Sequence, residues 1–302
     1  MSKILCICLS ATIQKTVLFD SLRLQDVNRS KSYIKDAAGK AINSARVLNQ
    51  LEKGCVSAVC PTGKENQDEF LSLIKKDGIK LINVETPGAV RECLTLLDTT
   101  NHTTTEIVVS EPELKEDYTE TEEALLGIIR KEITNADGVL LAGSRPVWFT
   151  PGICSIIAKI ACDAGKVFLA DYCGQDLKRT LEVCTPAIIK INENEFVSTF
   201  DLSVYPSESE LKDLITIKSS ELNNTIIVTR GKKPTFAACC GTFTDFPVEK
   251  ISPVNTTACG DSFSAGYLYE FLETGDFETA LAKGTWCAAR NAENIRCGSI
   301  EG

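Results

Sequence analysis

Short apolar runs alternate with amphipathic segments along most of this chain, and no other feature constrains its fold as much. Apolar runs of strand length lie at residues 4–9, 56–60, 80–84, 138–142, 167–170, 187–191 and 225–229. Helical spacing of apolar residues begins at 38–43 and recurs at 65–76, 119–133, 151–164, 208–222, 261–273 and 276–293. Runs of this kind are typical of strands buried on both faces. Because strands joined through helices pair in parallel by right-handed crossovers, the sequence predicts an α/β fold around a mostly parallel sheet.

Two segments, at about 10–37 and 88–110, depart from this alternation. Their apolar and polar residues alternate over short stretches, which suits an exposed sheet better than the core. In the second segment, Asn101-His102 lies between two such stretches and predicts a hairpin. We therefore expect a single domain over residues 1–302, with these two segments forming a small β lid.

Charge, cysteine content and hydropathy exclude several classes of protein. A formal net charge of −9 is unfavourable for nucleic-acid binding, because phosphate backbones require an excess of Lys and Arg. Residues 1–9 are too short and too weakly flanked for a signal peptide, and no apolar run reaches membrane-spanning length, so we expect a cytoplasmic protein without a membrane partner. The 14 cysteines include no C-x-x-C pair, and His102 is the single histidine. Disulfides, structural zinc and a Ser-His-Asp triad are therefore disfavoured.

Residues 255–266 form a loop of small and polar residues that leads into a segment of helical periodicity. Backbone N–H groups at the start of a helix favour negative charge, so this loop suits a phosphate. Asp261 is placed to take a proton from a hydroxyl that attacks that phosphate. The alternative interpretation is that Asp261 only caps the helix.

A second polar stretch, Lys190-Ile191-Asn192-Glu193-Asn194-Glu195, follows a predicted strand and begins a short helix. Asn192 and Glu195 have the spacing of a capping box, in which each side chain binds the other residue's backbone N–H. An amide and a carboxylate on one turn can also hold the waters around Mg²⁺. Lys190 would then meet a phosphate.

Two basic residues lie where an anion could bind. Lys40 follows Gly39 at the start of a predicted helix, and Arg91 follows a Pro-Gly turn beside the predicted lid. Each alone is an ordinary surface residue, whereas an arginine facing a cleft would clamp a sugar phosphate. The chain contains neither G-x-x-x-x-G-K-[ST] nor G-x-G-x-x-G after its first strand, which disfavours P-loop NTPases and ordinary dinucleotide-binding enzymes.

Together these features resemble the ribokinase/PfkB family of carbohydrate kinases, and most closely its 1-phosphofructokinase and tagatose-6-phosphate kinase branch. Residues 38–43 resemble its G-G-K-G-I-N, residues 190–195 match K-x-N-x-x-E, and residues 255–261 resemble D-T-T-G-A-G-D. Further matches, in the same order as in the family, lie at 27–29, 90–91, 105–106, 143–146 and 229–231. The resemblance covers essentially the whole chain. It implies a three-layer ribokinase-like fold, ATP and Mg²⁺ as cofactors, and phosphoryl transfer to a hydroxyl of a sugar phosphate of the fructose-1-phosphate or tagatose-6-phosphate type.

The resemblance also implies roles for individual residues. Asp261 would be the general base towards the acceptor hydroxyl, and the backbone N–H groups that face the transferred phosphoryl group would come from Ala258, Cys259 and Gly260. The nucleotide would be bound by Lys190, Asn192, Glu195, Thr229, Gly231 and Asn291, with Asn192 and Glu195 near Mg²⁺ through water. The acceptor would be bound by Gln14, Gly39, Lys40, Asn43, Arg91 and Ser144. The lid would close over the sugar and form the contact of a homodimer.

This sequence departs from the family pattern mainly on the sugar-facing side. Gln14 stands where the family has Asp, and Ala38, Ala41 and Ala258 stand where it has Gly. The expected base and Mg²⁺-site residues keep the family types, so these departures point to a changed acceptor. Two alternatives stay open: a catalytically degenerate ligand-binding or regulatory protein, and a kinase for an unphosphorylated sugar or nucleoside.

One expectation concerns Cys259 alone. A thiol at the start of a helix should have a lowered pKa and react readily with alkylating reagents. The alternative is an inert, packed thiol.

Overall fold

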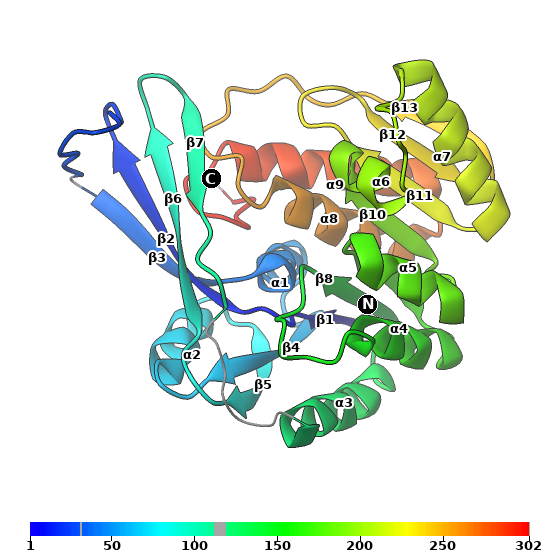
Figure 1. Ribbon diagram of the computed structural model, residues 1–302, viewed down its shortest axis with the longest axis horizontal. Helices are drawn as coiled ribbons and strands as arrows, with labels where there is room; N and C mark the ends of the chain where they lie inside the picture. The colour runs from blue at the N-terminus through cyan, green and yellow to red at the C-terminus, as the bar shows by residue number, and fades with distance from the viewer. Residues whose placement is uncertain (31, 112–118, 302) are drawn as a thin grey trace.

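The computed structural model describes residues 1–30, 32–111 and 119–301. Its strands form two separate sheets, and the larger one contains, among the described residues, nine strands in the order β13-β12-β11-β10-β9-β8-β1-β4-β5 (Figure 1). Their bounds in that order are Thr242–Phe246, Thr235–Cys239, Thr225–Thr229, Ile188–Asn192, Val167–Asp171, Gly138–Ala142, Ile4–Ile7, Val56–Gly63 and Lys80–Thr86. The strands from β11 to β5 are parallel, and only β12 and β13 are antiparallel. The predicted α/β fold with a mostly parallel sheet is confirmed.

Helices cover both faces of this sheet, because alternate residues of each strand point to opposite sides. In β1, Ile4 and Cys6 pack in one core cluster, and Leu5 and Ile7 pack in the other. The first cluster includes side chains of α1 (Lys40–Leu51), α2 (Gln67–Lys75), α8 (Cys259–Thr274) and α9 (Phe277–Ala292). The second includes side chains of α3 (Thr119–Ile133), α4 (Ile153–Asp163), α5 (Gly174–Val183), α6 (Glu193–Thr199) and α7 (Glu208–Leu222). The molecule thus has three layers, with two cores separated by the sheet.

The smaller sheet has the order β3-β2-β6-β7 and stands beside the larger one (Figure 1). Its strands are β3 (Ser32–Ala38), β2 (Thr12–Phe19), β6 (Arg91–Asp98) and β7 (Thr103–Ile107). The predicted hairpin around Asn101-His102 is present, since β6 and β7 pair in antiparallel register. Whether this sheet acts as a lid, with the predicted bounds, stays a prediction.

One helix, α5, is absent from the expectations drawn from the sequence. Only Leu177 and Thr180 of its ten residues are buried, and most of the others are polar or charged, so the segment contains little apolar sequence. Among the described residues, no helix is both long enough and apolar enough to cross a membrane.

Candidate active site

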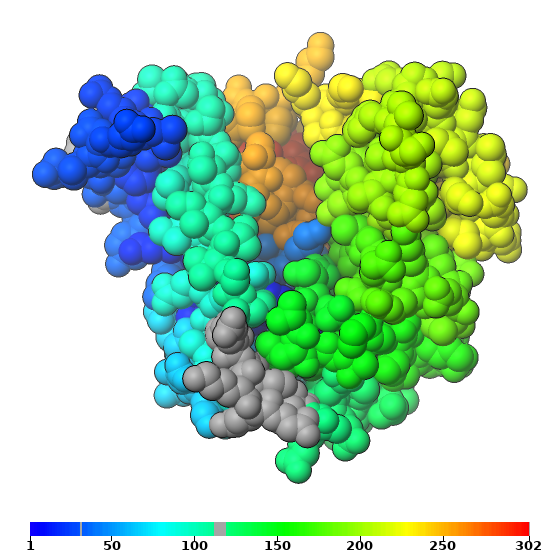
Figure 2. All heavy atoms as spheres, in the orientation of Figure 1, coloured from blue at the N-terminus to red at the C-terminus, as the bar shows by residue number. Residues whose placement is uncertain are grey.

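The polar residues singled out above gather at the edge of the large sheet where its parallel strands end. β9 ends at Asp171 and β10 at Asn192, and the first turns of α1 and α8 begin beside them. Figure 2 shows the molecule hollowed on this side, between the small sheet and the half that carries α6 and α7, with α8 (orange) at the floor. Ligands of open α/β sheets bind at this edge.

Asp171 is the centre of charge in this site. Its carboxylate is fully shielded from solvent and lies 3.1 Å from the Lys190 Nζ and 3.5 Å from the Lys40 Nζ. The Ser264 hydroxyl donates to Asp171 Oδ2 at 2.7 Å, while Oδ1 has no hydrogen-bond partner. Burial opposes ionisation of Asp171, but Lys190 and Lys40 outweigh it, so its pKa is lowered. The lowered pKa keeps the Asp171 carboxylate ionised at neutral pH, and its charge holds the two ammonium groups in place.

Asp261 lies in the first turn of α8 and does not cap the helix. The residue at the N-cap position is Ala258, and no side chain caps this end. The Asp261 side chain instead accepts a hydrogen bond at Oδ2 from Asn43 Nδ2 (2.9 Å), and Ser44 Oγ donates to its backbone oxygen (2.9 Å). Burial raises the pKa of Asp261 to about 6, against the opposing effects of Lys40 and Asn43. A carboxylate with a pKa near neutrality suits general-base chemistry.

Asn43 is itself oriented by a buried arginine. Arg46 donates from Nη1 to Asn43 Oδ1 (3.2 Å), which leaves the Asn43 amide nitrogen to face Asp261. Arg46 Nε is bound in turn by Asp77 at 2.9 Å. Arg296 joins the same cluster, 2.6 Å from Asp77 and 2.7 Å from Asp36 at the root of the small sheet. The sequence reasoning did not identify this supporting network.

The loop before α8 has the geometry expected of an anion-binding loop. Ala258 adopts a left-handed conformation with φ 66°, which explains why the family has glycine there. At Gly260 a Cβ would lie 2.7 Å from the Lys190 Nζ, so glycine lets the loop approach that ammonium closely. The loop is held from behind by Asn291, whose Nδ2 donates to Thr257 O (2.8 Å). Asn291 thus supports the loop.

The expected lowering of the Cys259 thiol pKa is wrong, and the alternative of a packed thiol is favoured. Burial raises the pKa of the Cys259 thiol to about 11, although Asn291 Nδ2 donates to its sulfur at 3.3 Å and lowers it in part. The first turn of a helix is favourable for a thiolate, but here the loss of hydration is the larger effect. Cys259 is a packed thiol, and only its backbone, at the start of α8, can play the role expected of this loop.

Asn192 and Glu195 form the predicted capping box. Glu195 N donates to Asn192 Oδ1 (2.9 Å), and Asn192 N donates to Glu195 Oε2 (2.8 Å). The other carboxylate oxygen of Glu195 lies 3.7 Å from the Lys40 Nζ. The cap therefore leaves one Glu195 oxygen facing the cluster around Asp171. Thr229, at the end of β11, pairs in register with Asn192 and so lies beside the same turn.

The residue after Thr229 has a structural role. Arg230 binds Glu193 at 2.9 Å and contacts Glu208, and its guanidinium stacks over the Phe236 ring at 3.8 Å. It therefore ties the start of α6 to the end of β11. Gly231 follows in a turn with φ 62°.

The residues expected to bind the acceptor come from the start of α1, from the small sheet and from the turn after β8. Gly39 packs so closely that a Cβ would lie 2.8 Å from Ser10 O, and its φ is 124°. Lys40 lies against the turn after β8, where Gly143 precedes Ser144. Gln14 is held within the small sheet, because its Nε2 donates to Thr95 Oγ1 at 2.8 Å.

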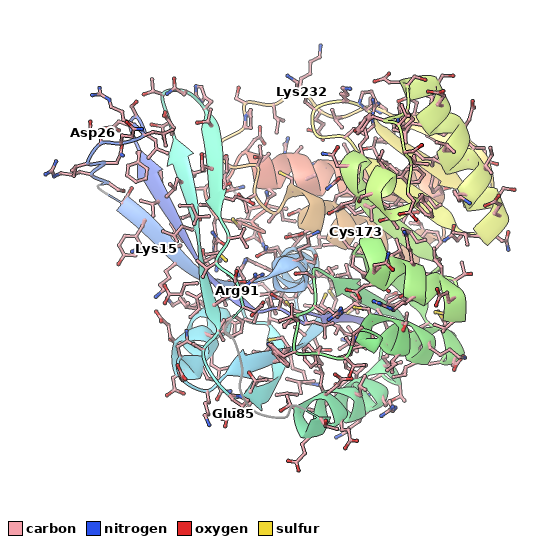
Figure 3. The ribbon with its side chains drawn as sticks, in the orientation of Figure 1. Lys15, Asp26, Glu85, Arg91, Cys173 and Lys232 are labelled. Atoms are coloured by element: carbon pink, nitrogen blue, oxygen red, sulfur yellow. The ribbon has the colours of Figure 1, made fainter. Side chains whose placement is uncertain are left out.

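Arg91 begins β6 and is bound by three groups. Its Nε donates to Thr12 Oγ1 at 3.1 Å and lies 3.2 Å from a carboxylate oxygen of Glu111. Its Nη1 donates to the backbone oxygen of Val109 at 3.3 Å. Arg91 lies at the base of the small sheet, on the side of α1 (Figure 3).

Asp171 is the functional residue that the sequence reasoning missed. It comes directly after the apolar run at 167–170, and a carboxylate at the carboxyl end of a parallel strand is the signal that would have found it.

A parallel sheet flanked by helices on both faces, a small sheet beside it and a loop of small residues leading into α8 are features of the ribokinase-like carbohydrate kinases. A model of the pfkB family of carbohydrate kinases matches residues 3–301, and the chain belongs to this family. Both the family and the enzyme class predicted from the sequence are confirmed.

Solved structures show the same fold. Phosphofructokinase-2 from Escherichia coli, in complex with substrates and products, superimposes with a TM-score of 0.86 at 15% identity, over 99% of this chain and 96% of that one. A protein from Thermotoga maritima described as a possible 1-phosphofructokinase has a TM-score of 0.86 at 19% identity, over 97% of this chain and 93% of that one.

Proposed function

We propose that this protein transfers the γ-phosphoryl group of ATP to a hydroxyl of a sugar phosphate, with Asp261 as general base. The observation that carries the proposal is the buried Asp261 carboxylate, with a pKa of about 6, in the first turn of α8 next to the anion loop. Asn43 binds Oδ2, and among the described residues no hydrogen bond engages Oδ1, which is left for the acceptor hydroxyl. As that hydroxyl attacks phosphorus, its proton passes to Asp261 and the leaving ADP oxygen keeps the bond's electron pair.

The charges opposite Asp261 suit a polyphosphate. Lys190 and Lys40 are held by Asp171, and the backbone at Gly260 approaches Lys190 closely. The N–H groups at the start of α8 are favourable for the negative charge on the transferred group. We infer that Lys190 contacts phosphate oxygens of the nucleotide, while Lys40 lies on the side of the acceptor.

The donor atoms also fit Mg²⁺. The cluster contains three carboxylates, Asp171, Asp261 and Glu195, against the ammonium groups of Lys40 and Lys190. Among the residues described, no group of three or more His, Cys, Asp or Glu side chains could hold a metal by itself. Because the carboxylates already face ammonium groups, they suit an ion that keeps several waters and binds mainly to the nucleotide phosphates. Asp171 Oδ1, which accepts no hydrogen bond and lies 3.5 Å from the Lys40 Nζ, and Glu195 are the groups that would face its waters, and the ion would neutralise phosphate charge.

The acceptor would bind between α1 and the small sheet. We propose Lys40, Arg91 and Ser144 for its phosphate, and Asn43 and Gln14 for its hydroxyls. The small sheet would close over the sugar, and its outer face would form a homodimer contact, both as the family resemblance implies. The cytoplasmic location also stays a prediction from the sequence.

An acceptor screen tests this function. ADP release is measured with Mg²⁺ and ATP across sugar phosphates, unphosphorylated sugars and nucleosides, with Asp261→Asn as the negative control. We expect turnover with a sugar phosphate of the fructose-1-phosphate or tagatose-6-phosphate type, lost in the variant. If the protein binds ATP but turns over no acceptor, it is a ligand-binding or regulatory protein. Turnover confined to unphosphorylated acceptors would move the function to the other alternative.

A further inference from the structure

The cluster around Arg91 contains an acidic residue that the family resemblance did not predict. Glu111 lies beyond the end of β7, and one of its carboxylate oxygens is 3.2 Å from Arg91 Nε. The Ser10 hydroxyl donates to the same oxygen. Arg91 Nε also donates to Thr12 Oγ1 at 3.1 Å. The chain's own carboxylate therefore occupies the Nε side of the guanidinium that is assigned to an acceptor's phosphate.

This cluster belongs to the acceptor side of the site. Thr12 and Arg91 are directly opposite each other where β2 pairs with β6, at the root of the small sheet. Ser10 O lies against Gly39, the residue before Lys40, and Lys40 reaches Asp171. Glu111 is thus anchored to the same turn that leads from β1 towards the acceptor.

Two hydroxyl groups hold this arrangement together. Ser10 lies just before β2 and Thr12 begins it, and their hydroxyls are the groups that contact Glu111 and Arg91. Both ions are largely removed from water, with 16% of the Arg91 side chain and 18% of the Glu111 side chain exposed. An external anion must therefore displace an internal carboxylate that is already desolvated and hydrogen-bonded.

We propose that Glu111 is a specificity-determining residue, a competing carboxylate that an acceptor's phosphate must displace from Arg91. The inference rests on the proposed function, because it assumes that the acceptor carries a phosphate. A phosphate dianion has the charge and the oxygens to exchange with one carboxylate at a guanidinium, whereas an uncharged acceptor gains nothing from Arg91. Glu111 thus weakens the binding of every anion at Arg91, so that only anions with a strong interaction with the guanidinium bind there.

Binding of inorganic phosphate to the whole protein tests this directly. Calorimetry compares the wild type with Glu111→Gln, which keeps the shape and removes the charge, and with Glu92→Gln, which removes an exposed charge from the neighbouring position of β6. We expect Glu111→Gln to lower the Kd for phosphate about tenfold and Glu92→Gln to leave it unchanged. In an Arg91→Ala background the effect of Glu111→Gln should disappear, since a double-mutant cycle isolates the contribution made through Arg91.

A second variant and a kinetic measurement keep the inference open to refutation. Ser10→Ala removes the other partner of the carboxylate and should tighten phosphate binding in the same direction, by less. The inference is overturned if phosphate binding is unchanged or weaker in both Glu111→Gln and Ser10→Ala. It is also overturned if Glu111→Gln lowers the Kd for phosphate equally in the wild-type and Arg91→Ala backgrounds. If Glu111→Gln tightens phosphate but no acceptor is turned over, the competing carboxylate stands and the kinase function fails. If a sugar phosphate is turned over with a KM that Glu111→Gln does not lower, the inference alone fails.

Discussion

Replacing Asp261 by asparagine should make the protein more stable at neutral pH while abolishing phosphoryl transfer. The Asp261 carboxylate is buried, and its pKa is raised from an ordinary value of 3.8 to about 6. The folded state therefore binds a proton more tightly than the unfolded chain, and above about pH 6 it carries the cost of an ionised, buried carboxylate. At about 1.4 kcal/mol per pKa unit, that cost is up to about 3 kcal/mol.

The sign and the pH window follow from the same two values. Below about pH 4 the carboxyl is protonated in both states, and the variant gains nothing from the lost charge. Between about pH 4 and pH 6 the wild type loses free energy of unfolding relative to the variant, and above pH 6 the difference is constant. Asparagine keeps the shape and can still accept the hydrogen bond from Asn43.

Urea unfolding of both proteins at intervals between pH 4 and pH 8 measures this difference. We expect the variant's advantage to grow from near zero to a plateau of about 2–3 kcal/mol at pH 7 and above. An advantage that does not vary with pH, or a variant that is less stable at pH 8, would show that the Asp261 carboxylate is not costly in the folded state. The reasoning for its role as a tuned base would then fail.

Three further predictions concern the neighbours of Asp261. Asn43→Ala removes the hydrogen bond that lowers the pKa of Asp261, so the acid limb of the profile of kcat/KM against pH should move above pH 6. Gly260→Ala places a Cβ 2.7 Å from the Lys190 Nζ and should raise the KM for ATP several-fold, as steady-state kinetics would show. Alkylation of Cys259 should be slow at pH 7 and accelerate towards its thiol pKa of about 11, as mass spectrometry of labelled peptides would show.

Each of these experiments has a matched control within the chain. The Ser44 hydroxyl contacts the backbone oxygens of Asp261 and Lys40 and does not bind the Asp261 carboxylate, so Ser44→Ala should leave the pH profile in place. A Cβ added at Gly127, in α3, would meet nothing within 4 Å, and Gly127→Ala should not change the KM for ATP. Exposed Cys240 should be alkylated before Cys259. Rapid labelling of Cys259 at pH 7 would contradict the raised pKa.

The helices and strands could be predicted from the sequence because the patterns that indicate them lie within short stretches of chain. The strand β11 and the helix α7 have the predicted bounds, since their apolar periodicity ends at clear breaks. The capping box of Asn192 and Glu195 was readable for the same reason, because its two partners are three residues apart. Helix α5 was missed because most of its ten residues are polar or charged and only two are buried, so the segment does not stand out as apolar.

Contacts between distant segments lay beyond the sequence. The pKa of Cys259 depends on how deeply the thiol is packed, which helix position alone does not specify. The pairing of Glu111 with Arg91 joins residues on separate segments of the small-sheet region. Asp171 at the end of β9 pairs with Lys190 from β10 and Lys40 from α1. Only the three-dimensional arrangement shows that the two lysines share one carboxylate.

The network that orients Asn43 constrains how related sequences can diverge. Asp77 is bound by both Arg46 and Arg296, and Arg296 also binds Asp36 on β3. Losing one of these charges leaves a buried partner without compensation, which is more costly than losing a whole pair. We expect these four positions to be inherited together, or replaced together, across relatives that keep the asparagine. Arg296 would then vary as little as residues that touch the substrate, although it lies outside the sequence motifs described above.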